Sequence, residues 1–566
     1  MAACLWLNTL DALFMFRLVS LCFLTMLIAF PANGEMQGER ERPYRSDGEQ
    51  IHAQCERLLQ QKGSPGGTAK ELLAIRLDRF YSGGGYQPLW TNRQRVDELI
   101  EALEESAADG LNPSDYDLIK IRQSVADTLV SPEKKARVDI LFTKAYLTLA
   151  THLRYGKTDP VTLEPYWKSQ EKREFGVLDD TLQRTLASGS ITAVFKELRP
   201  QDANYDLLKK GLARYRAIAE RGGWPRLAEG AVLKEGARDS RVAVLRKRLE
   251  VSGALVMASA DTSTVYNREM VEAVKKFQSR NGIDVDGSVG PTTFRVLNVP
   301  VEQRLDQIRV NLERYRSFLH DLPPTCILVN IPGYYLQYIE NGRSQWGSRV
   351  IVGQALRQTP VFGAAMHSLV FNPKWVVPRT VLDKDVLPAL NKDNSYLAKK
   401  QLRVVNEEGG TVDPASVNWS QYSAANLPYH LQQRSGDKGA LGRIKFLMPN
   451  PLAIYLHDTP GKELFDKSSR AFSSGCIRVQ NPAELARLVL RDSLRWSRAK
   501  IQEAINTGKT TMVTLPQQIP VFLLYFTVVP NGEELLFRED IYNRDKRALQ
   551  LLKSSTSGSQ VCREEK

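Results

Sequence analysis

The sequence predicts a multidomain α+β fold: a helical N-terminal scaffold, then a small three-helix domain, then a mainly β domain that carries a long insertion. Three observations lead to this prediction. At 566 residues the chain is too long for one compact core. Its first half has apolar residues at helical spacing. From about residue 325, short β-branched and aromatic runs alternate with Pro-Gly and Asn-Gly turns.

Composition and charge are those of a folded globular chain. Hydrophobic residues make up 42% of the chain and charged residues 25%. The net charge of +13 would suit an anionic partner such as nucleic acid, a membrane face or an acidic wall polymer. Lysine and arginine are nevertheless dispersed among aspartate and glutamate, which favours a mixed, solvated surface.

The N-terminus has the layout of a secretory signal peptide. Arg17 precedes the apolar run "LVSLCFLTMLIAF", and "PANGE" supplies small residues around a cut after Gly34. We predict a signal peptide over residues 1–34, export of the rest of the chain and, because an exported protein meets little nucleic acid, no nucleic-acid partner. The alternative is an uncleaved anchor near the inner membrane, although Asp11 and Arg17 make this stretch a poor single span.

The cysteines do not form a disulfide framework. Of six, two lie in the predicted signal peptide, and Cys55, Cys326, Cys476 and Cys562 are widely separated. Pairing among Cys55, Cys326 and Cys562 stays open. Since the chain has no CxxC pair and no HExxH motif, we expect neither a metal nor another cofactor.

Residues 35–227 are predicted to form the helical scaffold. In "TNRQRVDELIEALEES", apolar residues at i, i+3, i+4 and i+7 make one face of a helix. Thr91 or Asn92 can cap this helix at its N-terminus.

Residues 228–300 are predicted to form a separate domain of three short helices. The stretch "DVDGSVGP" is not a calcium loop, because Val289 and Arg295 stand where the loop needs glycine and a bidentate glutamate. The signature "AVKKFQSRNGIDVDGSVGPTT" resembles the small peptidoglycan-binding domain of many wall hydrolases and transferases. The alternative is a helical spacer that kept the fold without a ligand site.

The mainly β domain is predicted over residues 301–500. Its weakly periodic segment 383–441 is long enough to be a lid or binding loop. Residues 501–551 are predicted as C-terminal strands, and residues 552–566 as a disordered tail.

One cysteine has a physical reason to be reactive. In "SSGCIRVQNPAELARLVL", Asn481 can be an N-cap, Pro482 the first helical residue and Glu484 the partner in a capping box. Cys476 then lies just before a helix, whose positive end together with Arg478 would favour the thiolate.

A nucleophilic thiol also needs a base, and His457 is the one histidine near it in sequence. The backbone N–H groups of Gly475 and Cys476 are candidate oxyanion donors, with the hydroxyl of Tyr455 as a helper. On spacing alone, two buried core residues are an equally good interpretation.

The complete motif resembles that of the L,D-transpeptidases with a YkuD-type catalytic domain. The stretch "HDTP", followed by "SSGCIRVQN", matches the family elements at His457, Ser474, Gly475, Cys476 and Arg478. Many members have histidine where this chain has Ser474, which is a feature of the larger YcbB-like subgroup. The segments "FNPKWVVP", "GALGRIKFLMPN" and "AIYLHDTP" also recur in that subgroup, as does the order of domains.

The resemblance implies a cysteine acyltransferase of the periplasm that acts in peptidoglycan biosynthesis, cell-wall organisation and cell shape. Its partners would be peptidoglycan stem peptides: a donor tetrapeptide and the diaminopimelate amine of an acceptor. The thiolate of Cys476 would attack the diaminopimelate carbonyl of the donor and release D-Ala, and the acceptor amine would resolve the thioester. His457 would be the base, oriented by the backbone carbonyl of Asp458. Arg478, Ser474 and Trp375 would contact substrate.

Two other functions are compatible with the same residues. Water could resolve the acyl-enzyme, which would make the chain a hydrolase of wall peptides or of lipoprotein–peptidoglycan links. Alternatively, the chain could be a non-catalytic wall-binding scaffold in which Cys476 only packs. Donor preference and oligomeric state do not follow from the sequence.

Overall fold

The computed structural model describes residues 46–60, 69–127, 131–167, 175–255, 263–320, 322–393, 395–436 and 439–554. The predicted signal peptide, Cys562 and all but the first residues of the predicted tail lie outside these ranges. In the described part of the chain, no helix is both long enough and apolar enough to cross a membrane.

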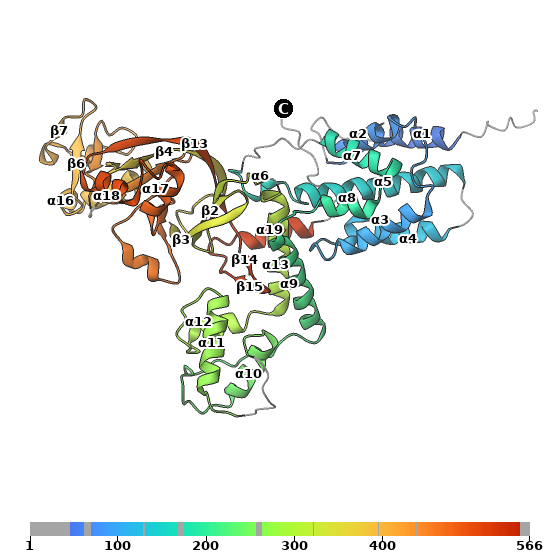
Figure 1. Ribbon diagram of the computed structural model, residues 1–566, viewed down its shortest axis with the longest axis horizontal. Coiled ribbons are helices and arrows are strands. Elements are labelled where there is room, and N and C mark those ends of the chain that lie inside the picture. The colour runs from blue at the N-terminus through green and yellow to red at the C-terminus, as the bar shows by residue number, and fades with distance from the viewer. Residues whose placement is uncertain are drawn as a thin grey trace, which may run out of the picture. The chain divides into compact units, whose positions relative to one another are not determined.

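The N-terminal part of the described chain is helical, as predicted, and Figure 1 draws it in blue to green. Its core centres on α5, whose buried face includes Tyr146, Leu149 and Leu153. The side chain of Asn92 accepts hydrogen bonds from two backbone N–H groups of α3 and so is the predicted cap. The helices are α1 (Asp47–Gln60), α2 (Ala69–Ser82), α3 (Arg93–Glu105), η1 (Pro113–Tyr116), α4 (Leu118–Ala126), α5 (Pro132–Tyr155), α6 (Pro160–Leu163), α7 (Phe175–Ser188), α8 (Ile191–Glu197) and α9 (Ala203–Glu220).

The predicted three-helix domain consists of α10 (Arg241–Val251), α11 (Arg268–Arg280) and α12 (Pro291–Leu297). These helices gather around their own apolar core, to which Leu245 and Phe277 contribute (Figure 1). The long helix α13 (Val301–Phe318) follows and leads to the β domain.

The β domain is built on one mixed sheet of nine strands in the order β11-β3-β12-β10-β9-β4-β13-β1-β2. Because β2 also pairs with β3, eight of these strands close into a ring, and one large core fills it. The strands are β1 (Cys326–Asn330), β2 (Tyr335–Glu340), β3 (Arg343–Gly353), β4 (Phe362–Phe371), β9 (Ile444–Leu447), β10 (Leu456–His457), β11 (Ala471–Ser473), β12 (Ile477–Val479) and β13 (Thr511–Leu524).

The segment between β4 and β9 contains the predicted insertion and has a core of its own, which includes Leu390, Val404 and Leu431. It forms a four-stranded sheet in the order β5-β8-β6-β7. Its elements are β5 (Trp375–Val376), α14 (Arg379–Val381), η2 (Leu382–Val386), α15 (Leu387–Leu390), α16 (Tyr396–Lys399), β6 (Leu402–Val405), β7 (Thr411–Val412), η3 (Pro414–Ser416), η4 (Trp419–Gln421) and β8 (His430–Gln433). Strands this short explain the weak periodicity of the sequence.

The prediction of C-terminal strands over residues 501–551 is partly wrong. This region also contains helix, and β13 lies inside the main sheet, between β1 and β4. Leu552, predicted to be in the disordered tail, is buried at the end of α19. The remaining elements are α17 (Pro482–Leu490), α18 (Arg498–Asn506), β14 (Val528–Asn531), β15 (Glu534–Phe537) and α19 (Arg544–Lys553).

Two buried arginines of helix α13 have carboxylate partners. Arg316, 1% exposed, donates to the Glu313 carboxylate at 2.7 Å, to the Asp109 carbonyl at 2.6 Å and to the Tyr205 hydroxyl at 2.8 Å. Arg314, 2% exposed, donates to the Asp545 carboxylate at 2.5 Å. These contacts tie α13 to α9, to the loop after α3 and to α19.

Candidate active site

The candidate site lies on one face of the closed sheet, where β10 meets β9 and β12. In the parallel pair β10–β12, His457 stands beside Arg478. In the antiparallel pair β10–β9, His457 stands opposite Lys445. Since paired residues of neighbouring strands point to the same face of a sheet, the three side chains share one face.

The same alternation brings Tyr455 and Cys476 to that face. Tyr455 is two residues before His457, and Cys476 is two residues before Arg478, so each points the same way as its successor. The ring of Tyr455 meets the ring of His457 edge to face, with centroids 5.6 Å apart. The structure therefore groups Cys476, His457, Tyr455 and Arg478, as predicted, and adds Lys445.

His457 is 5% exposed and is held by its own strand end. Its Nδ1 lies 2.5 Å from the carbonyl oxygen of Asp458, which can only accept, so Nδ1 carries the proton and Nε2 has the free lone pair. The Asp458 carboxylate in turn accepts from the Arg443 backbone N–H at 2.8 Å and from Lys462. These bonds fix the residue whose carbonyl orients the ring.

Burial lowers the pKa of His457 to about 3, and the charges of Arg478 and Lys445 act in the same direction. The carbonyl groups of Asp458 and Leu441 oppose this effect only in part. The imidazole is therefore neutral at neutral pH and available as a base.

The loop before β12 is shaped around Gly475. Its φ of +117° lies in the range that favours glycine, and a Cβ there would come within 3.3 Å of Ile454. The Gly475 carbonyl accepts from Thr359 Oγ1 at 2.7 Å, and its N–H donates to Ser473 Oγ at 3.1 Å. The prediction that this N–H is a free oxyanion donor is therefore wrong. Among the described residues, the Cys476 N–H keeps no backbone partner and is the remaining candidate.

Arg478 favours the thiolate, as predicted, but burial of Cys476 has the larger effect. Burial raises the pKa of the Cys476 thiol, and hydrogen bonds from Tyr455 and the charges of Lys445 and Arg478 only reduce that rise. The thiol itself faces the Ala453 carbonyl, with Sγ to O at 3.9 Å. Cys476 and His457 are thus a neutral thiol and a neutral imidazole before substrate binds.

The helix after the cysteine is capped differently from the prediction. Asn481 is the N-cap of α17 and Pro482 opens the helix, but the Asn481 side chain makes no capping hydrogen bond. Glu484 turns to Arg487, at 2.7 Å, and to Arg498, at 3.1 Å, so there is no capping box. The charges that favour the Cys476 thiolate are those of Lys445 and Arg478.

Neither of these two cations has a carboxylate partner among the described residues. The Lys445 ammonium lies 3.9 Å from the centre of the Tyr455 ring, and burial lowers the pKa of Lys445. The Nε atom of Arg478 is buried without a hydrogen-bond partner among the described residues. Two unpaired cations beside a thiol make a site that attracts an anionic group.

Two further predicted residues link this site to the insertion. Trp375, on β5, is close enough to the Tyr455 side chain to lower the pKa of its hydroxyl, against the larger rise that burial causes. Ser474, exposed beside the cysteine, accepts from Arg357 Nη1 at 3.0 Å. Arg357 also forms a two-pronged ion pair with Asp385 of η2, so the insertion is tied to the cysteine loop.

Sequence reasoning missed Lys445, Thr359 and the turn that holds Ala453. Ala453 has a φ of +53°, and the side chain of Asn450 bonds to both sides of the turn, donating to the Ile454 carbonyl at 2.8 Å. A lysine inside the apolar strand "IKFL", three residues after the "GALG" run, was the available signal for Lys445. The pairing of β9 with β10 is needed to see that Lys445 lies opposite His457.

Within the described ranges, no three His, Cys, Asp or Glu side chains are grouped so that they could hold a metal ion. Cys55 and Cys326 are free, buried thiols, and burial raises the pKa of each to about 12. Cys476 is the least buried of the three described cysteines.

Comparison with known families identifies the class of domain that carries this site. Residues 324–513 match YkuD, the L,D-transpeptidase catalytic domain. Residues 76–212 match a scaffold domain, and residues 238–297 match the model described as "Putative peptidoglycan binding domain". The chain therefore carries a YkuD-type L,D-transpeptidase catalytic domain behind a scaffold domain and a peptidoglycan-binding domain, as its sequence motifs indicated.

Individual relatives match parts of the chain. A protein of Haemophilus influenzae named "Putative L,D-transpeptidase" is 38% identical over 221 residues, which are 39% of this chain and 45% of that protein. The N-acetylmuramoyl-L-alanine amidase CwlL of Bacillus licheniformis is 46% identical over 69 residues, which are 12% of this chain and 19% of that protein. The chain thus covers less than half the length of these relatives. The crystal structure of an L,D-transpeptidase from Xylanimonas cellulosilytica is 14% identical, with a TM-score of 0.16, and covers 52% of this chain and 99% of that one.

Proposed function

We propose that this protein is a periplasmic L,D-transpeptidase that links one diaminopimelate to another in peptidoglycan through a thioester on Cys476. One observation carries the proposal. Within the YkuD match, a thiol, an oriented neutral imidazole and two unpaired cations share one face of the sheet. The proposed role is in peptidoglycan biosynthesis, and through it in cell-wall organisation and cell shape.

Acylation starts from the neutral pair. His457 Nε2 takes the thiol proton as Cys476 Sγ attacks the diaminopimelate carbonyl of a donor tetrapeptide. The charge that forms on the carbonyl oxygen is stabilised by the Cys476 N–H and the Tyr455 hydroxyl. The C–N bond to D-Ala then breaks, His457 returns the proton to the leaving amine, and a thioester remains.

Deacylation uses the same groups in reverse. The side-chain amine of an acceptor diaminopimelate attacks the thioester, and His457 removes its proton. The C–S bond breaks as the amide forms, and the proton returns to the sulfur. The product is a cross-linked peptide, and the enzyme is restored.

Lys445 and Arg478 give the donor its orientation. Stem peptides carry carboxylates, and the two cations are partly buried beside the nucleophile without a counter-ion among the described residues. We assign Arg478 to a donor carboxylate. Lys445, over the Tyr455 ring, stabilises negative charge as it develops on Sγ and on the carbonyl oxygen.

The insertion is the proposed lid over the acyl-enzyme. Its contacts with Tyr455, through Trp375, and with Ser474, through the Arg357–Asp385 pair, support a role in excluding water. A thioester shielded from water would be resolved by an amine rather than hydrolysed.

The test is incubation of the full chain with purified disaccharide tetrapeptide, followed by mass analysis. We expect a cross-linked dimer that has lost one D-Ala, and no dimer from Cys476→Ala. A dimer formed equally by the variant would refute the mechanism. A tripeptide product that does not depend on an amine would indicate hydrolysis instead.

Thiol labelling separates an enzyme from a wall-binding scaffold. A thiol-specific or carbapenem-type acylating probe should modify Cys476 far faster than Cys55 or Cys326, because burial raises the pKa of both of those thiols to about 12. Equally slow labelling of all three cysteines would favour the scaffold.

A further inference from the structure

A second group of unpaired buried cations lies far along the chain from the thiol. Arg248 of α10 is 2% exposed and Arg304 of α13 is 8% exposed. Neither has a carboxylate partner among the described residues. Arg304 donates to the side-chain oxygens of Asn281, at 2.8 Å, and Gln307, at 2.9 Å, both of which are neutral.

Arg248 is the more exceptional of the two. Its Nε donates to the Leu297 carbonyl at 2.8 Å, but its Nη1 is buried without a partner among the described residues. The guanidinium is stacked over the Trp224 ring, 4.0 Å from its centre. Burial lowers the pKa of Arg248 to about 9, so the side chain still carries its charge at neutral pH.

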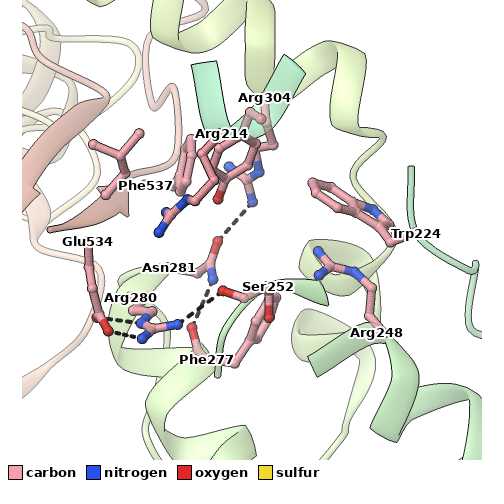
Figure 2. A pocket seen from close by; sticks show the side chains of 12 residues that line it. Arg214, Trp224, Arg248, Ser252, Phe277, Arg280, Asn281, Arg304, Glu534 and Phe537 are labelled. Atoms are coloured by element: carbon pink, nitrogen blue, oxygen red, sulfur yellow. Dashed lines mark hydrogen bonds and ion pairs between the residues drawn. The ribbon is translucent and has the colours of Figure 1, made fainter. Parts of the chain in front are cut away.

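The two guanidinium groups line one recess together with Arg214 and Arg280 (Figure 2). One carboxylate, that of Glu534, lies in the same recess and is engaged by Arg280, with Nε to Oε2 at 2.5 Å. Four arginines thus face a single glutamate. Since a buried charge without a counter-ion is costly, an anionic group that entered the recess would be stabilised there.

The size of the recess limits what can supply that charge. Its volume of about 20 Å³ is room for one small group, and not for a polymer segment. Next to it lies a cleft of about 660 Å³, within the range of ligand sites, and Asn281, Arg304 and Phe537 line both spaces. A ligand could therefore place one terminal group in the recess and its body in the cleft.

The charges of the cleft favour a zwitterionic body over a polyanion. Its lining carries both signs: four cations, Arg295, Arg304, Arg538 and Lys546, and five carboxylates, Glu302, Asp306, Glu539, Asp540 and Asp545. A polyanion would meet the carboxylates, whereas a peptide that carries both amines and carboxylates can match both signs.

We propose that this junction of α9, α10, α11, α13 and β15 binds the free carboxylate of a peptidoglycan stem peptide, with the carboxylate among Arg214, Arg248 and Arg304. The choice of a stem peptide rests on the proposed function, and it agrees with the location of Arg248 and Arg280 in the matched peptidoglycan-binding domain. The site is separate from the thiol and would hold substrate strands near the enzyme.

The test is hydrogen exchange of the full-length Cys476→Ala chain, titrated with disaccharide tetrapeptide, because this variant cannot consume the ligand. We expect slower exchange in residues 221–227 and 528–537, with no such change for the same peptide with amidated carboxyl groups. Equal slowing by the amidated peptide, slowing by a glycerol-phosphate polymer in its place, or no slowing at all would overturn the proposal.

Two variants test whether Arg248 and Arg214 bind the carboxylate of the stem peptide. Arg248→Met keeps the stacking on Trp224 and removes the unpaired charge, and Arg214→Gln changes an exposed side chain. Each should weaken binding at least about tenfold, as expected for loss of a charged hydrogen bond. Lys247→Met, an exposed neighbour on α10, is the matched control and should bind like the parent chain. Unchanged binding in both arginine variants would overturn the proposal.

Transfer by the chain with intact Cys476 distinguishes this inference from the proposed function. If transfer occurs but the arginine variants bind normally, the junction site is wrong and the enzyme assignment stands. If the variants lose binding but no transfer occurs, the junction site stands and the enzyme assignment is wrong.

Discussion

Arg316 and Arg248 are both almost completely buried, but their surroundings differ. Arg316 has the Glu313 carboxylate at 2.7 Å, whereas Arg248 has an aromatic ring and one carbonyl but no carboxylate among the described residues. The pair Lys445 and Arg478 resembles Arg248 in this respect. Paired cations join parts of the fold, and unpaired ones lie where we propose that an anionic ligand binds.

The difference has a simple energetic basis. Breaking a buried ion pair leaves an uncompensated charge, whereas removing an unpaired buried charge relieves a desolvation cost. The two kinds of site should therefore respond to mutation in opposite ways. Changes at four places in the molecule test this contrast, from the largest expected effect to the smallest.

Removing the acid beside Arg316 should be the most damaging change. Glu313→Gln leaves the guanidinium uncompensated and also weakens the bonds from Thr158, so we expect a loss of about 3–5 kcal/mol in unfolding free energy. Urea denaturation followed by circular dichroism measures it. Glu302→Gln, an exposed change on the same helix, should alter stability by less than about 0.5 kcal/mol. Equal stability of the two variants would contradict the contrast.

His457 is a buried titratable group that must stay neutral among cations. Its pKa of about 3 in the folded chain compares with about 6.5 in the unfolded chain. Between these values the unfolded chain binds a proton that the folded chain does not, so stability falls as the pH falls. His457 should account for about 3 kcal/mol of the loss between pH 6.5 and pH 4.

Comparison of urea unfolding at pH 6.5 and pH 4 checks this value. His457→Gln should lose less stability over that interval than the parent chain, whereas the exposed His430→Gln should match the parent. The same neutral imidazole predicts that the rate of transfer has no acid limb near pH 6.5. An acid limb near pH 6.5 in the parent chain would contradict the low pKa of His457.

Lys445→Met should weaken the chemistry without weakening the fold. Lys445 opposes the rise in the pKa of Cys476, so its loss should raise that pKa further and slow thiol alkylation at pH 7 by about tenfold. Stability should be unchanged or higher, because an unpaired charge is removed. Lys467→Met, exposed on the loop before β11, is the control. A destabilised variant with a normal alkylation rate would show that Lys445 stabilises the fold and does not affect the thiol.

The ion pair between Arg357 and Asp385 should have the smallest effect on stability. The Asp385 side chain is 38% exposed, so Asp385→Asn should cost no more than about 1 kcal/mol. The change should appear instead as faster hydrogen exchange in residues 382–390, because the contact between the insertion and Ser474 is weakened. Asp383→Asn, an exposed neighbour, should exchange like the parent chain. Equal exchange in both variants would mean that the ion pair does not restrain the insertion.

Local signals predicted local structure well. The cap at Asn92 and the three helices of the small domain followed from patterns within a dozen or so residues, and the structure confirms them. The motif around Cys476 and His457 likewise located the cluster on the sheet. The role of β13 could not be predicted, because a strand's neighbours are set by pairing across the whole domain.

The errors at the site have the same origin. The sequence suggested a capping box at Glu484 and groups that favour the thiolate at Cys476, since both inferences used only neighbours along the chain. In the structure, Arg498 competes for Glu484, and burial outweighs the cations around the thiol. Lys445 was missed because it meets the thiol only after β9 and β10 pair.

The placement of β13 has a consequence for biosynthesis. Ile327, near the start of the β domain, pairs with Val521, near its end, so the ring of strands stays open until the last strand has been made. Contacts this distant in sequence form slowly, and an open ring exposes strand edges. The chain should therefore have to avoid aggregation until synthesis is complete. The site around Cys476 should form only in the finished polypeptide.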